Sequence, residues 1–197
     1  MYRGAPNISI ASADVAWVTA NDGTTGAGVN EFSKTVNGGT TWTPGTITIT
    51  GAFAPANIVA LNADTAWVAE YPTSGAGGKV LKTLDGGATW TQVSTAAMFT
   101  NSASFLNVVH FFNANDGFCM GDAVTSEFEI YYTSDGGTTW TAVDAANKPD
   151  ALSGEMGWTS VYDAPGTTAY FGTNKGRIFK STDKGVTWTM SAPGLTD

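Results

Sequence analysis

A phrase of eight residues ending in tryptophan occurs four times, and its even spacing constrains the fold more than any other feature. The copies read TVNGGTTW, TLDGGATW, TSDGGTTW and STDKGVTW, and they end at Trp42, Trp90, Trp140 and Trp188. Steps of 48, 50 and 48 residues separate the tryptophans. A nearly fixed period of this length indicates one structural unit repeated four times.

Two further phrases recur in the same register within each unit. The first comprises NISI from Asn7, NIVA from Asn57, NVVH from Asn107 and WTSV from Trp158. The second comprises ADVAWV, ADTAWV, NDGFCM and TTAYFG, which hold Trp17, Trp67, Phe118 and Tyr170. Each unit therefore contains four short apolar runs separated by turns, and no stretch keeps a helical period.

Four short strands in a unit of about 45–50 residues are typical of a β-propeller blade. One blade cannot bury both faces of its sheet, so successive blades pack side by side. The sequence predicts an all-β fold of four consecutive four-stranded antiparallel blades with almost no helix. Residues 1–197 would form one propeller domain or half-propeller, with blades at approximately 7–49, 57–95, 105–145 and 157–192.

The order of residues in the eight-residue phrase has a physical reason. An acid or amide followed by glycine can bond its own turn backbone, while glycine supplies the positive φ that the turn needs. The strand that follows is predicted to place its tryptophan between adjacent blades, as part of the core rather than on a ligand-binding surface.

The phrase resembles the Asp-box, or bacterial neuraminidase repeat, whose pattern is S-x-D-x-G-x-T-W. Asp-boxes occur in sialidases, some endoglucanases and sortilin-type receptors. The form seen here looks most like the photosystem II assembly-factor propellers and related secreted bacterial propellers. The resemblance covers nearly the whole chain and implies the fold, whereas one fold hosts many functions. The structural Asp-box positions are Thr35, Asn37, Gly39, Trp42, Thr83, Asp85, Gly87, Trp90, Thr133, Asp135, Gly137, Trp140, Ser181, Asp183, Gly185 and Trp188.

Residues that catalysis would require are scarce in this chain. The sialidase resemblance implies three arginines that bind the substrate carboxylate, and the sequence holds only Arg3 and Arg177. A glycosidase needs two facing acids, and three of the 17 acids are already assigned to Asp-box turns. The single histidine, His110, and the single cysteine, Cys119, are interpreted as packed residues. The sequence therefore predicts a protein that is not an enzyme and has no catalytic residues.

Charge and hydropathy narrow the classes of partner. Seventeen acids against nine bases give a net charge of -8 with no basic run, which disfavours nucleic acid. No apolar run is long enough to predict a membrane span. The first ten residues do not read as a signal peptide, so the chain is either intracellular or a mature or excised segment. We expect an extracellular or cell-surface location, with a cytoplasmic one left open.

Ligand binding is expected on the face opposite the Asp-box turns. Loops from the second to the third strand, and from one blade to the next, share that face, and they vary in length and composition among the units. The predicted ligand-binding residues are Tyr71, Phe99, Asp122, Glu127 and Trp158. Acids beside aromatic rings suit carbohydrate, a basic peptide or Ca²⁺. No metal or cofactor is predicted, and Ca²⁺ held between loops is the alternative.

These observations favour a non-catalytic, secreted or cell-surface propeller that acts as a binding or scaffold module for protein or glycan. Two alternatives stay open: a fragment of a sialidase- or endoglucanase-type hydrolase with its catalytic residues on other blades, and an assembly factor of the photosystem II stability type. Four blades could belong to a longer ring, be completed by another chain, or close on themselves. An open arc would expose its two flanks, on which we expect Trp17, Phe32, Phe179 and Trp188.

Overall fold

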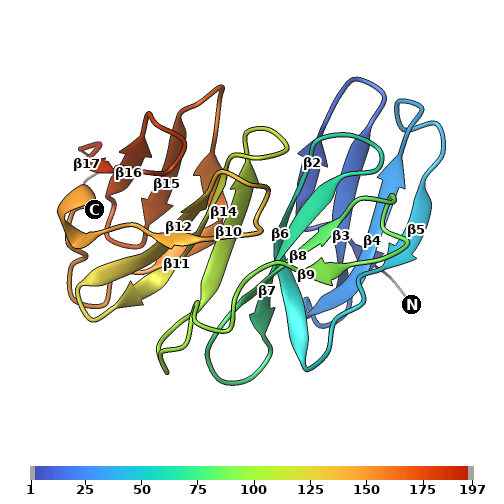
Figure 1. Cartoon of the computed structure of the whole chain (residues 1–197). Helices are drawn as coiled ribbons and strands as arrows, with labels where there is room; N and C mark the ends of the chain where they lie inside the picture. The colour runs from blue at the N-terminus through green and yellow to red at the C-terminus, as the bar shows by residue number, and fades with distance from the viewer. Residues whose placement is uncertain (1–2, 195–197) are drawn as a thin grey trace.

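The computed structural model describes residues 3–194, and these form four antiparallel sheets that follow one another along an arc (Figure 1). Residues 1–2 and 195–197, the ends of the predicted domain, lie outside the described residues. One short 3₁₀ helix, η1 (Ala145–Asn147), interrupts the β-structure in the described part of the chain. Within residues 3–194, no helix is both long and apolar enough to cross a membrane. The predicted all-β fold with almost no helix is confirmed.

Each sheet is one blade, and the strands of a blade lie in chain order from the inside of the arc outward. Blade 1 comprises β1 (Arg3–Gly4), β2 (Ile8–Ile10), β3 (Ala16–Asp22), β4 (Gly28–Thr35) and β5 (Thr43–Thr46). Blade 2 comprises β6 (Phe53–Ala60), β7 (Ala66–Pro72), β8 (Lys79–Thr83) and β9 (Thr91–Gln92). Blade 3 comprises β10 (Leu106–Phe111), β11 (Gly117–Val124), β12 (Glu127–Thr133) and β13 (Thr141–Ala142). Blade 4 comprises β14 (Gly157–Asp163), β15 (Ala169–Thr173), β16 (Ile178–Ser181) and β17 (Thr189–Ser191).

Blade 1 differs from the other three in its innermost strand. This strand is split, because β1 and β2 both pair with β3 and are separated by residues 5–7. Blade 1 therefore has five strands by count but keeps the four-strand plan.

The Asp-box turns join the third and fourth strands of every blade and share one hydrogen-bond pattern. In blade 2, the Thr83 hydroxyl donates to Asp85 Oδ1 at 2.8 Å and accepts the Gly87 N–H at 2.9 Å. Asp85 Oδ1 also accepts the Thr89 N–H at 2.9 Å, and Oδ2 accepts the Thr89 hydroxyl at 2.6 Å. Gly87 has φ of +88°, which explains the glycine. The carboxylate therefore closes the turn as the sequence predicts.

Three apolar cores lie between the four blades, one at each junction of the arc. Trp90 belongs to the core between blades 1 and 2, where it meets Trp17 and Phe32 edge-on at 6.4 and 5.8 Å. Trp188 is 4% exposed in the core between blades 3 and 4, and Trp140 packs against the core between blades 2 and 3. Three of the four Asp-box tryptophans are thus inter-blade residues.

Trp42 is the exception, and the prediction that it is buried is wrong. It is 43% exposed because no blade of the described chain precedes blade 1. The expected flank residues are also wrong. Trp17, Phe32, Phe179 and Trp188 are all at most 4% exposed, since they point toward neighbouring blades within the arc.

Candidate functional site

A pocket lies where the innermost strands of all four blades begin, on the face opposite the Asp-box turns. Its volume is about 550 Å³. Residues of every blade contribute to its walls: Pro6, Asn7, Asn21, Gly26, Gly28, Pro55, Ala56, Tyr71, Phe105, Asn107, Asp122, Met156, Gly157, Trp158 and Thr159. We call this the axial pocket, because the inner strands surround the axis of the arc.

Three of the five predicted ligand-binding residues meet in the axial pocket. Tyr71 lies near the end of β7 and stacks on Phe105 of the next blade with ring centroids 4.9 Å apart. Trp158 is the second residue of β14 and is 51% exposed. Asp122 lies on β11 between them in the chain, so blades 2, 3 and 4 each supply one of the three. The sequence predicted only that these residues share a face of the propeller, and not that they meet in one pocket.

Asp122 is held in place by the walls of the pocket. Its Oδ1 accepts the Asn107 side-chain N–H at 2.7 Å and the Gly157 backbone N–H at 3.0 Å. Within the described residues both bonds go to Oδ1, which leaves Oδ2 for a ligand. Partial burial raises the pKa of Asp122 above its ordinary value, although the two hydrogen bonds act in the opposite direction.

Three asparagines spaced 50 residues apart tie the inner strands together around the axial pocket. Asn7 donates to Ala56 O at 2.8 Å. Asn57 donates to Val109 O and accepts the Val109 N–H, both at 2.9 Å. Asn107 continues the series through Asp122. The repeated asparagine is visible in the sequence, and its fixed position at or beside the first strand of each unit is the signal for this role.

A second cavity of about 440 Å³ shares Pro6, Asn7 and Thr159 with the axial pocket and follows the inner strands toward the Asp-box face. His110, Tyr162 and Asp163 line it. The two cavities therefore border each other along the inside of the arc.

Two predicted ligand-binding residues lie elsewhere. Phe99 is only 3% exposed and packs edge-on against Tyr131 at 5.2 Å, because the loop carrying it folds into the core between blades 2 and 3. Phe99 is therefore not on a recognition surface, contrary to our expectation. Glu127 forms an ion pair with Lys148 at 2.9 Å, outside the axial pocket.

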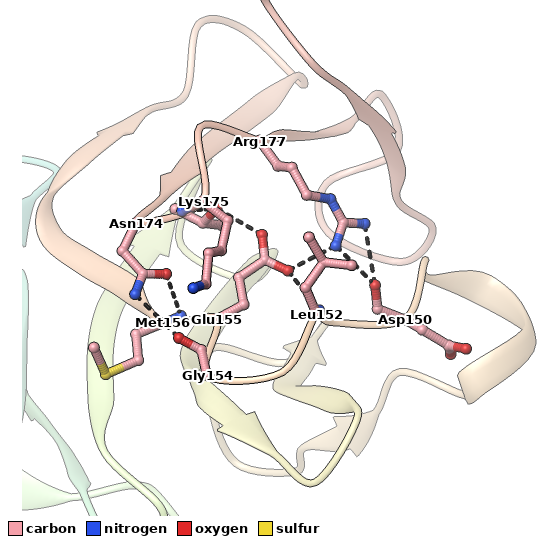
Figure 2. A network of polar contacts seen from close by, with 9 residues as sticks. Asp150, Leu152, Gly154, Glu155, Met156, Asn174, Lys175 and Arg177 are labelled. Atoms are coloured by element: carbon pink, nitrogen blue, oxygen red, sulfur yellow. Dashed lines mark hydrogen bonds and ion pairs between the residues drawn. The ribbon is translucent and has the colours of Figure 1, made fainter. Parts of the chain in front are cut away.

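A buried ion pair fixes the loop that leads into Trp158 (Figure 2). Arg177 donates to Glu155 Oε2 at 2.6 Å and through two nitrogens to Asp150 O at 3.0 Å. Glu155 also accepts the Leu152 N–H at 2.8 Å and the Thr173 hydroxyl at 2.6 Å. Glu155 directly precedes Met156 and Gly157, so this network sets one wall of the pocket. One of the two arginines is thus structural.

Glu70 is the most unusual acid of this face. It lies on β7, is 0% exposed, and neither carboxyl oxygen has a hydrogen-bond partner among residues 3–194. Burial raises the pKa of Glu70 to about 8. Its cross-strand neighbour Lys79 turns away and donates to Thr50 O at 2.9 Å.

The histidine and the cysteine are both packed residues. His110 touches Phe112 and Tyr162, and burial lowers its pKa to about 4. Cys119 is fully buried, and burial raises the pKa of its thiol. Across residues 3–194, no group of three or more His, Cys, Asp or Glu side chains is placed to hold a metal ion. In the NANDG run, Asp116 pairs with Lys184 of the next blade instead.

Sequence comparison assigns the family. A model of the family described as Photosynthesis system II assembly factor YCF48 matches residues 6–143 and 73–194, which together span nearly the whole chain. The chain belongs to the YCF48 assembly-factor family. The predicted resemblance to this group is therefore confirmed. No curated protein sequence matches the chain.

Solved structures share the propeller fold at low sequence identity. A structure described as YCF48 bound to D1 peptide is 18% identical, with a TM-score of 0.51 over 95% of this chain and 68% of its own. YCF48 from Cyanidioschyzon merolae is 17% identical, with a TM-score of 0.64 over 96% and 56%. The GH74 xyloglucanase from Xanthomonas campestris is 16% identical, with a TM-score of 0.60 over 90% and 27%. The chain thus spans about two thirds and about half of the two YCF48 chains.

Proposed function

We propose that the chain is a non-catalytic binding module that holds an extended polypeptide segment of a partner protein in the axial pocket. The observation that carries this proposal is the convergence of Tyr71, Asp122 and Trp158 on one pocket. The aromatic rings offer apolar surface, and Asp122 Oδ2 offers a charged acceptor for an N–H or a cationic group.

Two facts support a polypeptide as the ligand. The axial pocket borders a second cavity along the inner strands, and an extended chain can reach both cavities, whereas a compact ligand fills one. One member of the family has been solved bound to a peptide, by its description the D1 peptide. If the chain is an assembly factor, the alternative prediction, its partner would be a photosystem II subunit. The secreted or cell-surface location stays a prediction.

Glycan binding is the second candidate, favoured by one observation. Trp158 is exposed beside an acid, and the GH74 likeness extends over 90% of this chain. An exposed indole next to a carboxylate suits the apolar face and hydroxyls of a sugar. Among the described residues that line the axial pocket, Asp122 is the only carboxylic acid, whereas glycosidases use two facing acids. We therefore propose that any glycan is bound and not hydrolysed.

An array experiment tests the proposal. The labelled chain is applied to immobilised 15-residue synthetic peptides and, in parallel, to xyloglucan oligosaccharides and sialosides, and the dissociation constant of each hit is then measured by calorimetry. Trp158→Ala and Asp122→Asn should each weaken peptide binding at least about tenfold, as loss of a central anchor does. Leu84→Ala and Asp144→Asn are matched controls, because they remove an exposed apolar side chain and an exposed acid outside the pocket.

The outcomes separate the candidates. Peptide hits that both pocket variants weaken support the proposal. Hits only on glycans, weakened by the same variants, favour the second candidate. Hits that neither variant affects contradict the assignment of the axial pocket.

A further inference from the structure

Asp122 is bonded to the backbone of both aromatic walls of the axial pocket. Its own N–H donates to Phe105 O at 2.9 Å, and its Oδ1 accepts the Gly157 N–H at 3.0 Å. Phe105 stacks on Tyr71, and Gly157 is directly followed by Trp158. One carboxyl group is therefore tied both to a stacked pair of rings and to the strand that carries an exposed indole.

The backbone that carries these rings is held in place by the protein itself. Phe105 forms a β-bridge with Gly77 of blade 2. Two residues before Trp158, the Met156 N–H donates to the side chain of Asn174 at 2.9 Å (Figure 2). Because these positions are already ordered, a ligand that binds against the rings loses little affinity to ordering them.

The charges around the axial pocket favour a cationic group. Among the described residues that line it, Asp122 is the only acid, and none is lysine or arginine. The face of an aromatic ring attracts a cation, and the net charge of -8 attracts one from a distance. An acidic segment would instead place its carboxylates beside Asp122, with no basic side chain in the lining to compensate.

The hydrogen bonds of Asp122 select among cationic groups. Its Oδ1 accepts the Asn107 side-chain N–H at 2.7 Å as well as the Gly157 N–H at 3.0 Å. A carboxylate oxygen has two lone pairs, so Oδ1 is saturated and Oδ2 is left for a ligand. Arginine binds best to a carboxylate with both oxygens free, because its guanidinium donates to the two in parallel. An ammonium group needs one acceptor, and the alkyl chain of lysine can lie along apolar rings.

We propose that the axial pocket selects a lysine side chain of the partner polypeptide, with its ammonium on Asp122 Oδ2 and its alkyl chain against Tyr71 and Trp158. This inference rests on the proposed function, since it names the group of the polypeptide that the pocket binds. The α-amino group at the start of a polypeptide shares this chemistry, and one peptide of the test distinguishes the two sources.

A set of nine-residue host peptides tests the choice of side chain. They alternate glycine and serine, are capped at both ends, and carry lysine, arginine, ε-acetyl-lysine or norleucine at the centre. A fifth peptide carries central norleucine and an uncapped N-terminus. Dissociation constants are measured by NMR titration, followed on the indole N–H signals of the protein.

The lysine peptide should bind at least about tenfold more tightly than the norleucine and acetyl-lysine peptides, because they lack the charge-assisted hydrogen bond. The arginine peptide should fall between them, since it keeps the contact with the rings but makes only one bond to the carboxylate. The norleucine peptide with the free N-terminus should bind like its capped form.

Three variants connect this preference to the pocket. Asp122→Asn removes the charge at nearly constant shape, so it should abolish the preference for lysine over norleucine. Trp158→Ala should weaken the binding of both peptides, because it removes apolar surface. Asp144→Asn is the matched control, an exposed acid outside the pocket, and should keep the preference. The NMR spectrum of each variant shows that it is folded.

The outcomes separate this inference from the proposed function. Equal binding of the lysine and norleucine peptides, weakened by Trp158→Ala, would keep the polypeptide-binding pocket and overturn the choice of lysine. Tighter binding of arginine than of lysine would overturn the argument from the saturated oxygen. Preference for the uncapped peptide would make the occupant a chain terminus and not a side chain. Absence of binding by every peptide at about 10 mM would contradict both the inference and the proposed function.

Discussion

Replacing Glu70 by glutamine should change how stability depends on pH. In the folded protein the pKa of Glu70 is about 8, against 4.5 for a free glutamate, because burial disfavours the charged form. The folded state therefore holds this proton up to a higher pH than the unfolded state does. The resulting stabilisation is complete below about pH 4.5 and is lost as the pH rises through about 8.

The magnitude follows from the difference of about 3.5 pKa units. At about 1.4 kcal/mol per unit, ionising Glu70 in place would lower the unfolding free energy by roughly 5 kcal/mol between pH 4.5 and pH 9. Glutamine has nearly the same shape and no charge. The unfolding free energy of the Glu70→Gln variant, relative to that of the unmutated protein, should therefore rise by up to that amount between pH 4.5 and pH 9. A constant difference between the two proteins at low pH does not affect this rise.

Urea unfolding followed by tryptophan fluorescence at pH 5, 7 and 9 measures the difference. Other titrating groups cancel when the two proteins are compared at each pH. A difference that stays constant with pH would refute the reasoning. It would mean that Glu70 finds a charged partner, with Lys79 the nearest cross-strand cation.

Four further outcomes are expected. Trp90→Ala should cost about 3–5 kcal/mol of unfolding free energy, whereas Trp42→Ala at the equivalent exposed position should cost under about 1 kcal/mol; urea unfolding of both variants checks this. Arg177→Met should cost about 3–5 kcal/mol by the same assay, because it leaves the buried Glu155 carboxylate unpaired. Asp135→Asn should flatten acid unfolding between about pH 4 and 2, since hydrogen bonds from Thr139 lower the pKa of Asp135 to about 2 and that stabilisation is lost as the pH falls. Binding of a cationic peptide should weaken as the pH falls, because protonation removes the charge of Asp122. Since the pKa of Asp122 is raised, the weakening should begin at a higher pH than it would for an ordinary aspartate, and calorimetry across pH checks this.

The repeat made most of the fold predictable, because the Asp-box is a local device. Its carboxylate, hydroxyls and glycine bond within five residues of one another, so the sequence alone carries the turn. Asn37 shows how local it is, since its amide oxygen accepts the Thr41 N–H at 2.9 Å as aspartate does elsewhere. The exposure of Trp42 was not predictable in this way, because burial of this tryptophan depends on contact with a neighbouring blade.

The site was predictable only in outline, because loop paths depend on packing at a distance. Tyr71 and Trp158 were found because they border variable loops at strand ends. Phe99 sits in another of the variable loops, yet its ring fills the core between blades 2 and 3. Glu155 reads as a solvated loop acid until Arg177, 22 residues away, pairs with it. Nothing in the local sequence distinguishes these cases.

The asparagine series ends before blade 4, where a glycine forms part of the wall of the axial pocket. Asn7, Asn57 and Asn107 recur every 50 residues, whereas the corresponding phrase of blade 4 begins at Trp158, directly after Gly157. A Cβ there would lie 3.0 Å from Met120 Cε and 3.3 Å from the Asn107 side-chain nitrogen, so a larger residue would crowd the wall. With glycine, the backbone N–H reaches Asp122 instead, and Trp158 follows at once on the exposed side. The departure from the repeat thus joins the charged and aromatic parts of the pocket, in the blade where the packing series ends.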